Sequence, residues 1–381
     1  MKVAKLLFSD GEWITERNDE NLDYHKAQLI LGYGARAIIE KSDFFLLLKK
    51  KFPNADIALS SSSGEIFSNE VHDNTIALTA IGFSRSQIKS TQIDIEDFQN
   101  SFDAGCALMQ NLDKEDLKWV FVLSDGSKVN GSQLVEGINK IRPPHVLVSG
   151  GLAGDGDRFE KTSVGLNQTP KPNKIVAIGF YGDHLELSHS SCGGWESFGL
   201  ERTVTQSYNN ILYEIDHKNA LDLYKKYLGK YAEELPGSAL LFPLSIRSSE
   251  DDTHVVRTIL SINEKNNMMI FAGDLPEGGK VRFMKANMDR LTDAASAAAK
   301  ECLEINRNHS PKMAVIISCV GRKLVLGERI SEEVEIVRDI FGPQTMISGF
   351  YSYGEISPLK PFDDCVLHNQ TITITTLNET E

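Results

Sequence analysis

The chain has 381 residues, 41% hydrophobic and 24% charged, a composition typical of a globular protein. Acidic residues outnumber basic ones by 53 to 40, and the net charge of −13 argues against nonspecific binding to nucleic acid or anionic lipid. The length predicts two or three domains. The N-terminus is too weakly apolar for a signal peptide, and we find no apolar run long enough to span a bilayer. We therefore expect a cytoplasmic protein without membrane insertion.

Five cysteines are spread along the chain without a C-x-x-C pair or another metal-ligand spacing. Their odd number and the length of the chain argue against a disulfide framework and favour reduced thiols in a reducing compartment. They are Cys106, Cys192, Cys302, Cys319 and Cys365.

One unit recurs three times: an apolar strand, a glycine-containing turn, an amphipathic helix, a second apolar strand and a loop of small residues. In the first copy we expect a strand over 28–31, a turn over 32–34, a helix from Ser42 and a strand over 56–59. The loop that follows has the sequence Ser-Ser-Ser-Ser-Gly-Glu-Ile, residues 60–66.

The second copy has a strand over 119–123, a helix over 132–141 and a strand over 145–148 that enters the glycine-rich loop 149–156. In the third copy a strand over 314–317 is followed by a turn over 318–321, a helix over 331–341 capped by Ser331, and a strand over 345–348. Its loop, Gly-Phe-Tyr-Ser-Tyr-Gly-Glu-Ile, covers 349–356.

Between the second and third copies the sequence predicts a helix over 220–228, a strand over 239–246, a hairpin of 255–262 with 268–273, and an alanine-rich helix over 289–305. Strands parted by helices indicate parallel crossovers, and paired strands indicate hairpins. The expected fold is therefore α/β, with mixed sheets covered by helices and with similar loops meeting from different copies.

The three loops are candidates for a ligand cradle, because glycine lets a ligand approach the backbone and exposes N–H groups. The alternative is that each is only a tight connection. The loops contain no dinucleotide or phosphate-loop pattern. Their carboxylates, Glu65, Asp155 and Glu355, could act as general acid and base, or could serve as turn and capping groups.

Residues 188–195, Ser-His-Ser-Ser-Cys-Gly-Gly-Trp, hold a second candidate site. His189 and Cys192 would point to opposite faces of a strand, which argues against a catalytic dyad. An imidazole or thiolate here could instead hold a metal or haem iron, with Trp195 stacking on the ligand. The alternative is a strand that ends in a turn with Trp195 in the core.

Arg247 and Arg257 flank the acidic residues 250–252 on a predicted hairpin. Either arginine could clamp a carboxylate of a ligand, or both could form surface ion pairs. The full set of predicted ligand-binding residues is Ser62, Ser63, Gly64, Glu65, Gly150, Gly151, Gly154, Asp155, Cys192, Gly194, Trp195, Arg257, Tyr353, Gly354 and Glu355.

These segments resemble the FIST family, which has an N-terminal and a C-terminal domain. The resemblance implies an N-terminal domain over residues 1–210 and a C-terminal domain over 211–381. The similarity rests on residues 61–66, 148–156 and 194–199 in the first half, and on 220–229 and 349–356 in the second. The resemblance implies an intracellular sensory protein that is not an enzyme and that binds a small ligand. It also implies a signalling partner such as a histidine kinase or a cyclic-di-GMP enzyme.

Some family members of this size bind haem and sense nitric oxide, so haem b is a possible cofactor here, with His189 as the candidate iron ligand. Three hypotheses remain open at this point: a ligand-binding sensor, an enzyme that uses the loop carboxylates or Cys192, and a scaffold whose loops only tighten turns.

Overall fold

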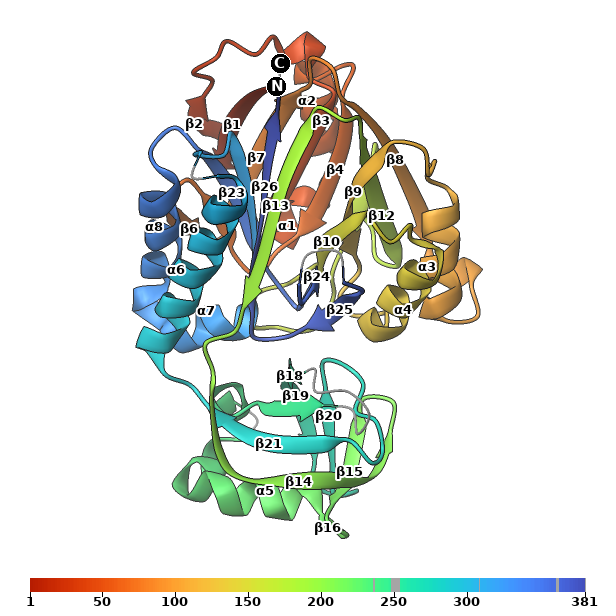
Figure 1. Cartoon of the computed structure of the whole chain (residues 1–381), viewed down its shortest axis with the longest axis vertical. Helices are drawn as coiled ribbons and strands as arrows, with labels where there is room; N and C mark the ends of the chain where they lie inside the picture. Colours follow the sequence, from red (N-terminus) through yellow and green to blue (C-terminus); the bar gives the residue numbers. More distant parts are fainter. Residues whose placement is uncertain (236, 248–253, 308, 361–362, 381) are drawn as a thin grey trace.

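The computed structural model describes residues 1–235, 237–247, 254–307, 309–360 and 363–380. They form a larger body, from residues on either side of 196–286, and a smaller body made of 196–286 itself, which lies below it in Figure 1. The chain ends meet at the far end of the larger body, where the amino group of Met1 lies 2.7 Å from Glu379 Oε2. No helix of the described residues has the length and apolarity to cross a membrane.

The larger body contains three six-stranded sheets. The first consists, in order, of β11 (Val164–Leu166), β4 (Asp56–Ser61), β3 (Leu29–Gly34), β7 (Ile76–Gly82), β1 (Lys2–Ser9) and β2 (Glu12–Arg17). The second consists of β25 (Cys365–His368), β24 (Gly354–Pro358), β10 (Leu147–Leu152), β9 (Leu117–Ser124), β12 (Lys174–Tyr181) and β8 (Gln87–Asp94). The third consists of β13 (Leu185–Cys192), β26 (Ile372–Glu379), β22 (Met313–Cys319), β23 (Met346–Ser352), β5 (Glu65–Phe67) and β6 (Glu70–His72).

The three sheets share one plan. Each has a parallel pair, β3 with β4, β9 with β10 or β22 with β23, flanked by an antiparallel strand, β7, β12 or β26. After the small-residue loop, the chain leaves its own sheet and pairs with the next one. Thus β5 joins β23, β24 joins β10, and β11 joins β4. The predicted α/β fold of repeated strand–helix–strand–loop units is confirmed, and the exchange of strands interlocks the units in a ring.

Helices cover the outer face of each sheet (Figure 1). The first sheet packs against α1 (Arg36–Ile39) and α2 (Ser42–Lys51), and the second against α3 (Ser101–Gln110) and α4 (Gly131–Ile141). The third packs against α6 (Met288–Ile305) and α8 (Ile330–Phe341). The short α7 (Val320–Leu326) follows β22 directly.

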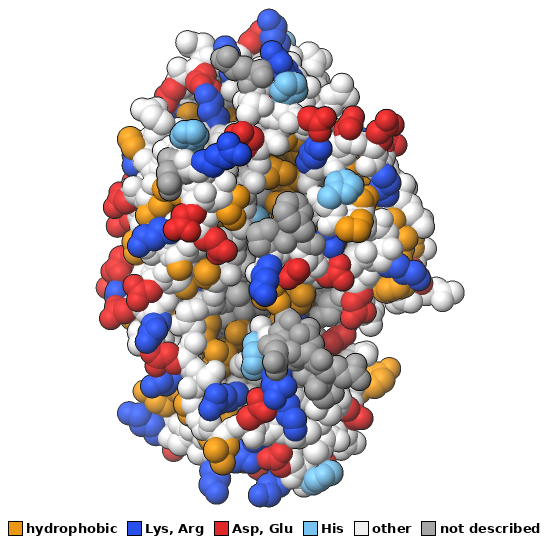
Figure 2. Space-filling model, in the orientation of Figure 1, with side chains coloured by type: hydrophobic (Ala, Val, Ile, Leu, Met, Phe, Trp, Pro, Cys, Tyr) orange, Lys and Arg blue, Asp and Glu red, His pale blue; other side chains and the backbone are white. Residues whose placement is uncertain are grey.

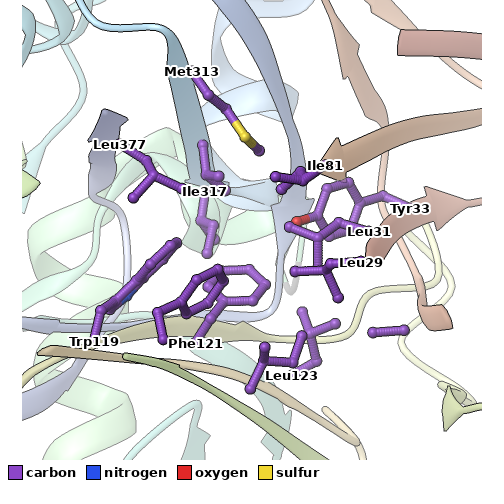
Figure 3. Packing of buried hydrophobic residues seen from close by; sticks show 14 of the residues in the cluster. Leu29, Leu31, Tyr33, Ile81, Trp119, Phe121, Leu123, Met313, Ile317 and Leu377 are labelled. Atoms are coloured by element: carbon purple, nitrogen blue, oxygen red, sulfur yellow. The ribbon is translucent and has the colours of Figure 1, made fainter. Parts of the chain in front are cut away.

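The inner faces of the three sheets pack on one another and form a common core (Figure 3). Tyr33 stacks on Phe350 at 4.7 Å between ring centroids, and Trp119 stacks on Phe180 at 4.3 Å. Each ring is fully buried or nearly so, and aromatic burial of this kind dominates the stability of a core. The three units therefore fold as one body.

The smaller body has its own core and a sheet that begins at β18 and ends at β19. In sheet order its strands are β18 (His254–Arg257), β17 (Leu244–Arg247), β21 (Lys280–Lys285), β14 (Glu196–Tyr208), β15 (Ile211–Ile215), β20 (Met268–Phe271) and β19 (Ile259–Asn263), with β16 (Lys218–Asn219) beside β15. Helix α5 (Ala220–Leu228) and 3₁₀ segments over Gly229–Glu234 and Gly237–Leu241 pack against it. The predicted domain boundary at 210/211 falls in the turn between β14 and β15.

Four local predictions are wrong. Residues 32–34 form the end of β3 and not a turn. A Cβ on Gly32 would lie 2.6 Å from Leu78 Cδ2, so the glycine here allows close packing of the sheet. The predicted turn at 318–321 is the end of β22 and the start of α7, with Gly321 packed against Gln370. Helix α8 begins after Arg329, so Ser331 is not its cap. The predicted strand 239–246 starts only at Leu244, after a 3₁₀ turn.

Candidate functional site

The three small-residue loops meet at one end of the larger body through a ring of backbone hydrogen bonds. Gly154 N donates to Ser61 O at 3.0 Å, which joins the second loop to the first. Ser63 N donates to Tyr351 O at 2.9 Å, which joins the first loop to the third. Tyr353 N donates to Leu152 O at 3.1 Å and closes the ring. The donors occupy equivalent positions in their loops, so the pseudo-threefold arrangement extends to individual hydrogen bonds.

Two buried glutamates hold the first and third loops in the same way. Glu65 accepts from Ser62 Oγ and, through its other oxygen, from Thr75 N at 3.2 Å and Thr75 Oγ1 at 2.8 Å. Glu355 accepts from Ser352 Oγ at 2.6 Å and from Thr371 N and Oγ1 at 3.2 and 2.9 Å. Each glutamate thus ties its loop to the residue before the next inner strand.

The second loop has Gly156 at the equivalent position, and an aspartate from another place does this work. Asp125, directly after β9, accepts from Asn173 N at 2.7 Å, and Asn173 immediately precedes β12. Its other oxygen accepts from Ser127, Lys128 and Thr162. In the second loop, Asp125 therefore makes the connection to the next inner strand that the glutamate makes in the other two loops, and Gly156 makes no such connection.

Burial raises the pKa of Glu65 to about 7, against the opposing hydrogen bonds from Ser62 and Thr75. Burial raises the pKa of Glu355 to about 7 as well. At Asp155, burial acts upward, but the guanidinium groups of Arg158 and Arg36 outweigh it and keep the pKa of this carboxyl below its usual value. Asp155 Oδ1 lies 2.5 Å from Arg158 Nη2 and 3.1 Å from Arg36 Nε, so it links the second loop to α1.

The predicted cradle glycines serve close packing. A Cβ on Gly150 would collide with the Val122 carbonyl oxygen of the neighbouring strand. A Cβ on Gly151 would lie 2.9 Å from Ile317 Cγ2 in the core, and one on Gly154 would collide with Ser63 Oγ of the first loop. These glycines allow the sheets and loops to approach one another, and all three are buried.

A chain of cavities runs from the loop ends of the larger body to its boundary with the smaller body. The loop cavity, about 350 Å³, contains Ser62, Ser63, Gly64 and Glu65. It shares Asp157 and Leu324 with the apolar cavity of 490 Å³. That cavity shares Phe159 and Leu260 with the aromatic cavity of 380 Å³, lined also by Tyr353 and Phe271. Asp274 connects the aromatic cavity to the arginine cavity, 620 Å³, which Arg257 lines.

The apolar, aromatic and arginine cavities share residues and form one cleft between the two bodies, and Figure 2 shows hydrophobic side chains at this boundary. The loop cavity is lined by the larger body alone and adjoins this cleft. Volumes of this size suit small organic ligands, which bind preferentially between domains. Of the predicted residues, Arg257 and Tyr353 thus line the cleft, and Ser62, Ser63, Gly64 and Glu65 line the loop cavity beside it.

Arg257 holds the two bodies together. Its side chain is only 5% exposed, and it donates to Leu367 O of the larger body at 2.8 Å and to Asp274 O at 3.2 Å. Burial lowers the pKa of this guanidinium to about 10. Asp274 also accepts from Asn130 Nδ2 at 3.1 Å, across the same boundary. Arg247 instead pairs with Glu201 at 2.9 Å, and residues 250–252 lie outside the described residues.

The predicted site at 188–195 covers the end of β13 and the linker between the bodies. Gly193, Gly194 and Trp195 connect β13 to β14, and Trp195 Nε1 donates to Gln370 O at 2.9 Å. Arg322 donates to Gly193 O and forms a fully buried ion pair with Glu333. Cys192 packs toward the helices, and burial raises the pKa of its thiol.

His189 lies on β13, inside the contact between two sheets. Its Nδ1 lies 2.9 Å from Thr375 Oγ1, in a polar chain that continues to Ser149 Oγ and Trp119 Nε1. Burial lowers the pKa of His189 to about 3. Its Nε2 has no hydrogen-bond partner, but none of the cavities described is lined by this residue.

A haem needs open space beside the ligating nitrogen, so the surroundings of His189 do not fit this cofactor. Among the described residues, no group of three His, Cys, Asp or Glu side chains could hold a metal ion, and all five cysteines are free.

Much of the cleft could not be seen in the sequence. The segment 126–131 after β9, the run Asp157 to Glu160 and the strand end 271–274 are far apart along the chain. They meet only because the smaller body folds back onto the loops. One local signal existed: the large apolar side chain of Phe159, three residues after the glycine-rich loop.

No curated protein matches the chain significantly. Among solved structures it is similar to the crystal structure of cyanuric acid hydrolase from A. caulinodans, with 8% identity, a TM-score of 0.38 and full coverage of both chains. A likeness of this extent carries no inference about activity. The family models match over nearly the whole chain, the FIST N domain over residues 28–218 and the FIST C domain over 220–358. The chain belongs to the FIST family, whose domains are sensory domains of signal transduction.

Proposed function

We propose that this protein senses a small organic molecule that binds in the cleft between its two bodies, and that the bound state is passed to a partner signalling protein. The cleft carries the proposal, because three cavities that share residues line the boundary between the bodies and the loop cavity adjoins them. In the family context, the partner classes that fit are a histidine kinase or a cyclic-di-GMP enzyme.

The connection between the bodies supports a change of state on binding. Two short linkers, residues 193–195 and 286–287, lie side by side, and Asn287 Nδ2 donates to Glu196 Oε1 at 3.2 Å. Gly194 has φ +86°, a conformation that favours glycine. A ligand that contacts both bodies stabilises the arrangement in which its contacts are best, and shifts the population toward it.

The ligand favoured here is not haem, because His189 lies in the sheet contact and away from the cleft. A role in nitric oxide sensing through this residue loses its support for the same reason. The proposal therefore rests on an organic ligand that enters the cleft.

An enzymatic role has one feature in its favour, since Glu65 has a raised pKa and lines the loop cavity. Its counterpart Glu355 makes the same set of bonds and has the same raised pKa, yet it lines none of the cavities described. The shared shift follows from the shared burial, which favours a structural role for both carboxyls.

The test is a thermal-shift screen of small metabolites on the full chain and on two tryptophan variants. Leu260→Trp fills the cleft from β19, where Leu260 is 40% exposed. Leu200→Trp is the control, since Leu200 is an exposed leucine of the same body outside the cleft cavities. We expect compounds that raise Tm in the wild type and in Leu200→Trp but fail in Leu260→Trp. Hits that bind all three proteins equally, or a screen without hits, would overturn the proposal.

A further inference from the structure

Three large apolar side chains from distant parts of the chain are exposed in the same place. Phe159, Leu260 and Leu324 are 37%, 40% and 40% exposed, and all three line the apolar cavity. Phe159 follows the second loop, Leu260 lies on β19, and Leu324 lies on α7. Exposed apolar side chains that gather in a concave surface mark an interaction site, whereas isolated ones do not.

Phe159 is held over an aromatic partner in an unusual backbone conformation. Its φ is +53°, in the left-handed region that bulky residues rarely adopt. Tyr353 Oη accepts from Phe159 N at 3.0 Å, and the two rings stack with centroids 4.7 Å apart. Phe271 lines the same aromatic cavity. Local strain that the surroundings maintain is typical of binding sites.

The charges around these walls are mainly negative. Asp157 and Glu234 line the apolar cavity, and Glu160 and Asp274 line the aromatic cavity. Across the part of the chain that the structure describes, Asp157, Glu160 and Glu234 form no ion pair with a lysine or arginine, and the one basic side chain in these two cavities is Lys128.

The other basic groups nearby, Arg158, Lys323 and Arg257, are already engaged. Arg158 pairs with Asp155 at 2.5 Å, and Lys323 donates to Ser63 O at 2.8 Å and pairs with Asp73. Arg257 donates to backbone carbonyl groups at the boundary of the bodies. An anionic ligand would therefore meet the unpaired carboxylates of Asp157, Glu160 and Glu234, against which Lys128 is, among the described residues, the one basic side chain in these two cavities.

We propose that the cleft recognises an organic cation with an apolar body, such as an arylalkyl or alkyl amine, an inference that rests on the sensory function proposed above. The apolar part packs on Phe159, Leu260 and Leu324, and the ammonium group lies near aromatic faces and the carboxylates of Asp157 and Glu160. Ring faces attract ammonium groups through the quadrupole of the ring, and neighbouring carboxylates add direct attraction.

The test compares three compounds that share a phenyl ring and differ in charge: phenethylamine, 3-phenylpropionate and phenylalanine. Calorimetric titration of the full chain should give saturable binding of the amine, weaker binding of the zwitterion and none of the carboxylate. Higher salt should weaken amine binding, because exposed charge pairs are screened. Tighter binding of the carboxylate than of the amine would overturn the inference.

Variants locate the binding. In the double variant Asp157→Asn with Glu160→Gln we expect amine binding to weaken by roughly five- to tenfold, the sum of two modest surface attractions. The matched control Glu335→Gln, on the exposed face of α8, should leave binding unchanged. Equal weakening in both would overturn the inference, as would unchanged binding in Leu260→Trp.

The outcomes also separate the two proposals. If none of the three phenyl compounds binds while other compounds still depend on Leu260, the sensory cleft stands and the cationic ligand class is wrong. If no compound of either set binds in the cleft, both proposals fail.

Discussion

The first and third loops of the larger body differ from the second in one buried group. Glu65 and Glu355 tie their loops to the next strands through the same three hydrogen bonds. In the second loop Gly156 replaces the glutamate, and Asp125 takes over from outside the loop. The chain after Gly156 then runs outward and carries Asp157 and Phe159 into the cleft.

This difference distinguishes residues that stabilise the repeated fold from residues that line the cleft. The features that all three units share, buried carboxyls and close-packed glycines, hold the units together. The second unit lacks the loop glutamate, and the segment that follows its loop, residues 157–160, lines the cleft. The shared residues should therefore govern stability, and the segment 157–160 should govern binding.

The largest effect should come from removing the substitute carboxylate. Asp125→Ala leaves several buried donors without a partner, among them Asn173 N and Thr162 Oγ1, and we expect a loss of about 4 kcal/mol in unfolding free energy. Glu355→Ala should cost only about 2 kcal/mol, because removing a buried acid also removes its desolvation penalty. Urea denaturation measures both losses of stability. A smaller loss in Asp125→Ala than in Glu355→Ala would contradict the structural role assigned to Asp125.

The two glutamates should also give stability a shared pH dependence. Each has a pKa of about 7 in the folded protein against an ordinary value of 4.5, so the unfolded chain releases the proton first. Stability therefore falls as pH rises from about 4.5 to about 7, by about 1.4 kcal/mol per pH unit and group, and levels off above that range.

Buried His189 and His368 act in the opposite sense, since burial lowers their pKa values to about 3 and about 4 and stability is lost as pH falls below 6.5. The comparison with Glu65→Gln and Glu355→Gln isolates the carboxyls. Between pH 4.5 and 7, the unfolding free energy of the double variant should rise relative to that of the wild type by about 3 kcal/mol per substituted site. A parallel pH profile for the two proteins would contradict the raised pKa values.

The close approach of the loops should be sensitive to a single methyl group. Gly154→Ala places a Cβ against Ser63 Oγ and N, and we expect a loss of about 2 kcal/mol. Gly156→Ala, two residues on, meets only Arg158 at 3.6 Å but has φ +64°, so about 1 kcal/mol is expected. Thermal denaturation of the two variants compares the cost of lost packing with the cost of backbone strain. A larger loss of stability in Gly156→Ala than in Gly154→Ala would show that the loops do not pack as described.

The smallest stability effect should accompany a clear binding effect. Tyr353→Phe removes the hydroxyl that holds Phe159 N and Gly156 O, at a cost of about 1 kcal/mol. Tyr224→Phe is the control, because its hydroxyl makes a similar bond to Phe242 O in the core of the smaller body. Both should lose similar stability, but only Tyr353→Phe should weaken ligand binding. Equal ligand affinities of Tyr353→Phe and Tyr224→Phe would show that the position of Phe159 does not affect binding.

The repeated body could be predicted because its elements have strong local patterns. Helix α4 (Gly131–Ile141) buries Leu134, Val135 and Ile138 at helical spacing, and its predicted range, 132–141, differs by one residue. Helix α3 was missed, since Gly105 interrupts its pattern so that it can pack against the backbone at Leu134. Strand β14 was missed because most of its side chains are not buried.

The site was only partly predictable for a different reason. Ser63 and Glu65 follow a recognisable strand and line the loop cavity beside the cleft. His189 looked reactive beside Cys192 and Trp195, but alternation along β13 turns it into the contact between sheets. Leu260 and Phe271 carry no local signal, because their role depends on how the smaller body sits against the loops.

The central claim is that a ligand binds between the two bodies, and hydrogen exchange of the full chain with and without a bound hit tests it most directly. Binding in the cleft should slow exchange on both sides, at 126–131 and 157–160 of the larger body and at 258–260 and 271–274 of the smaller one. Protection confined to one body, or centred on β13 around His189, would contradict it.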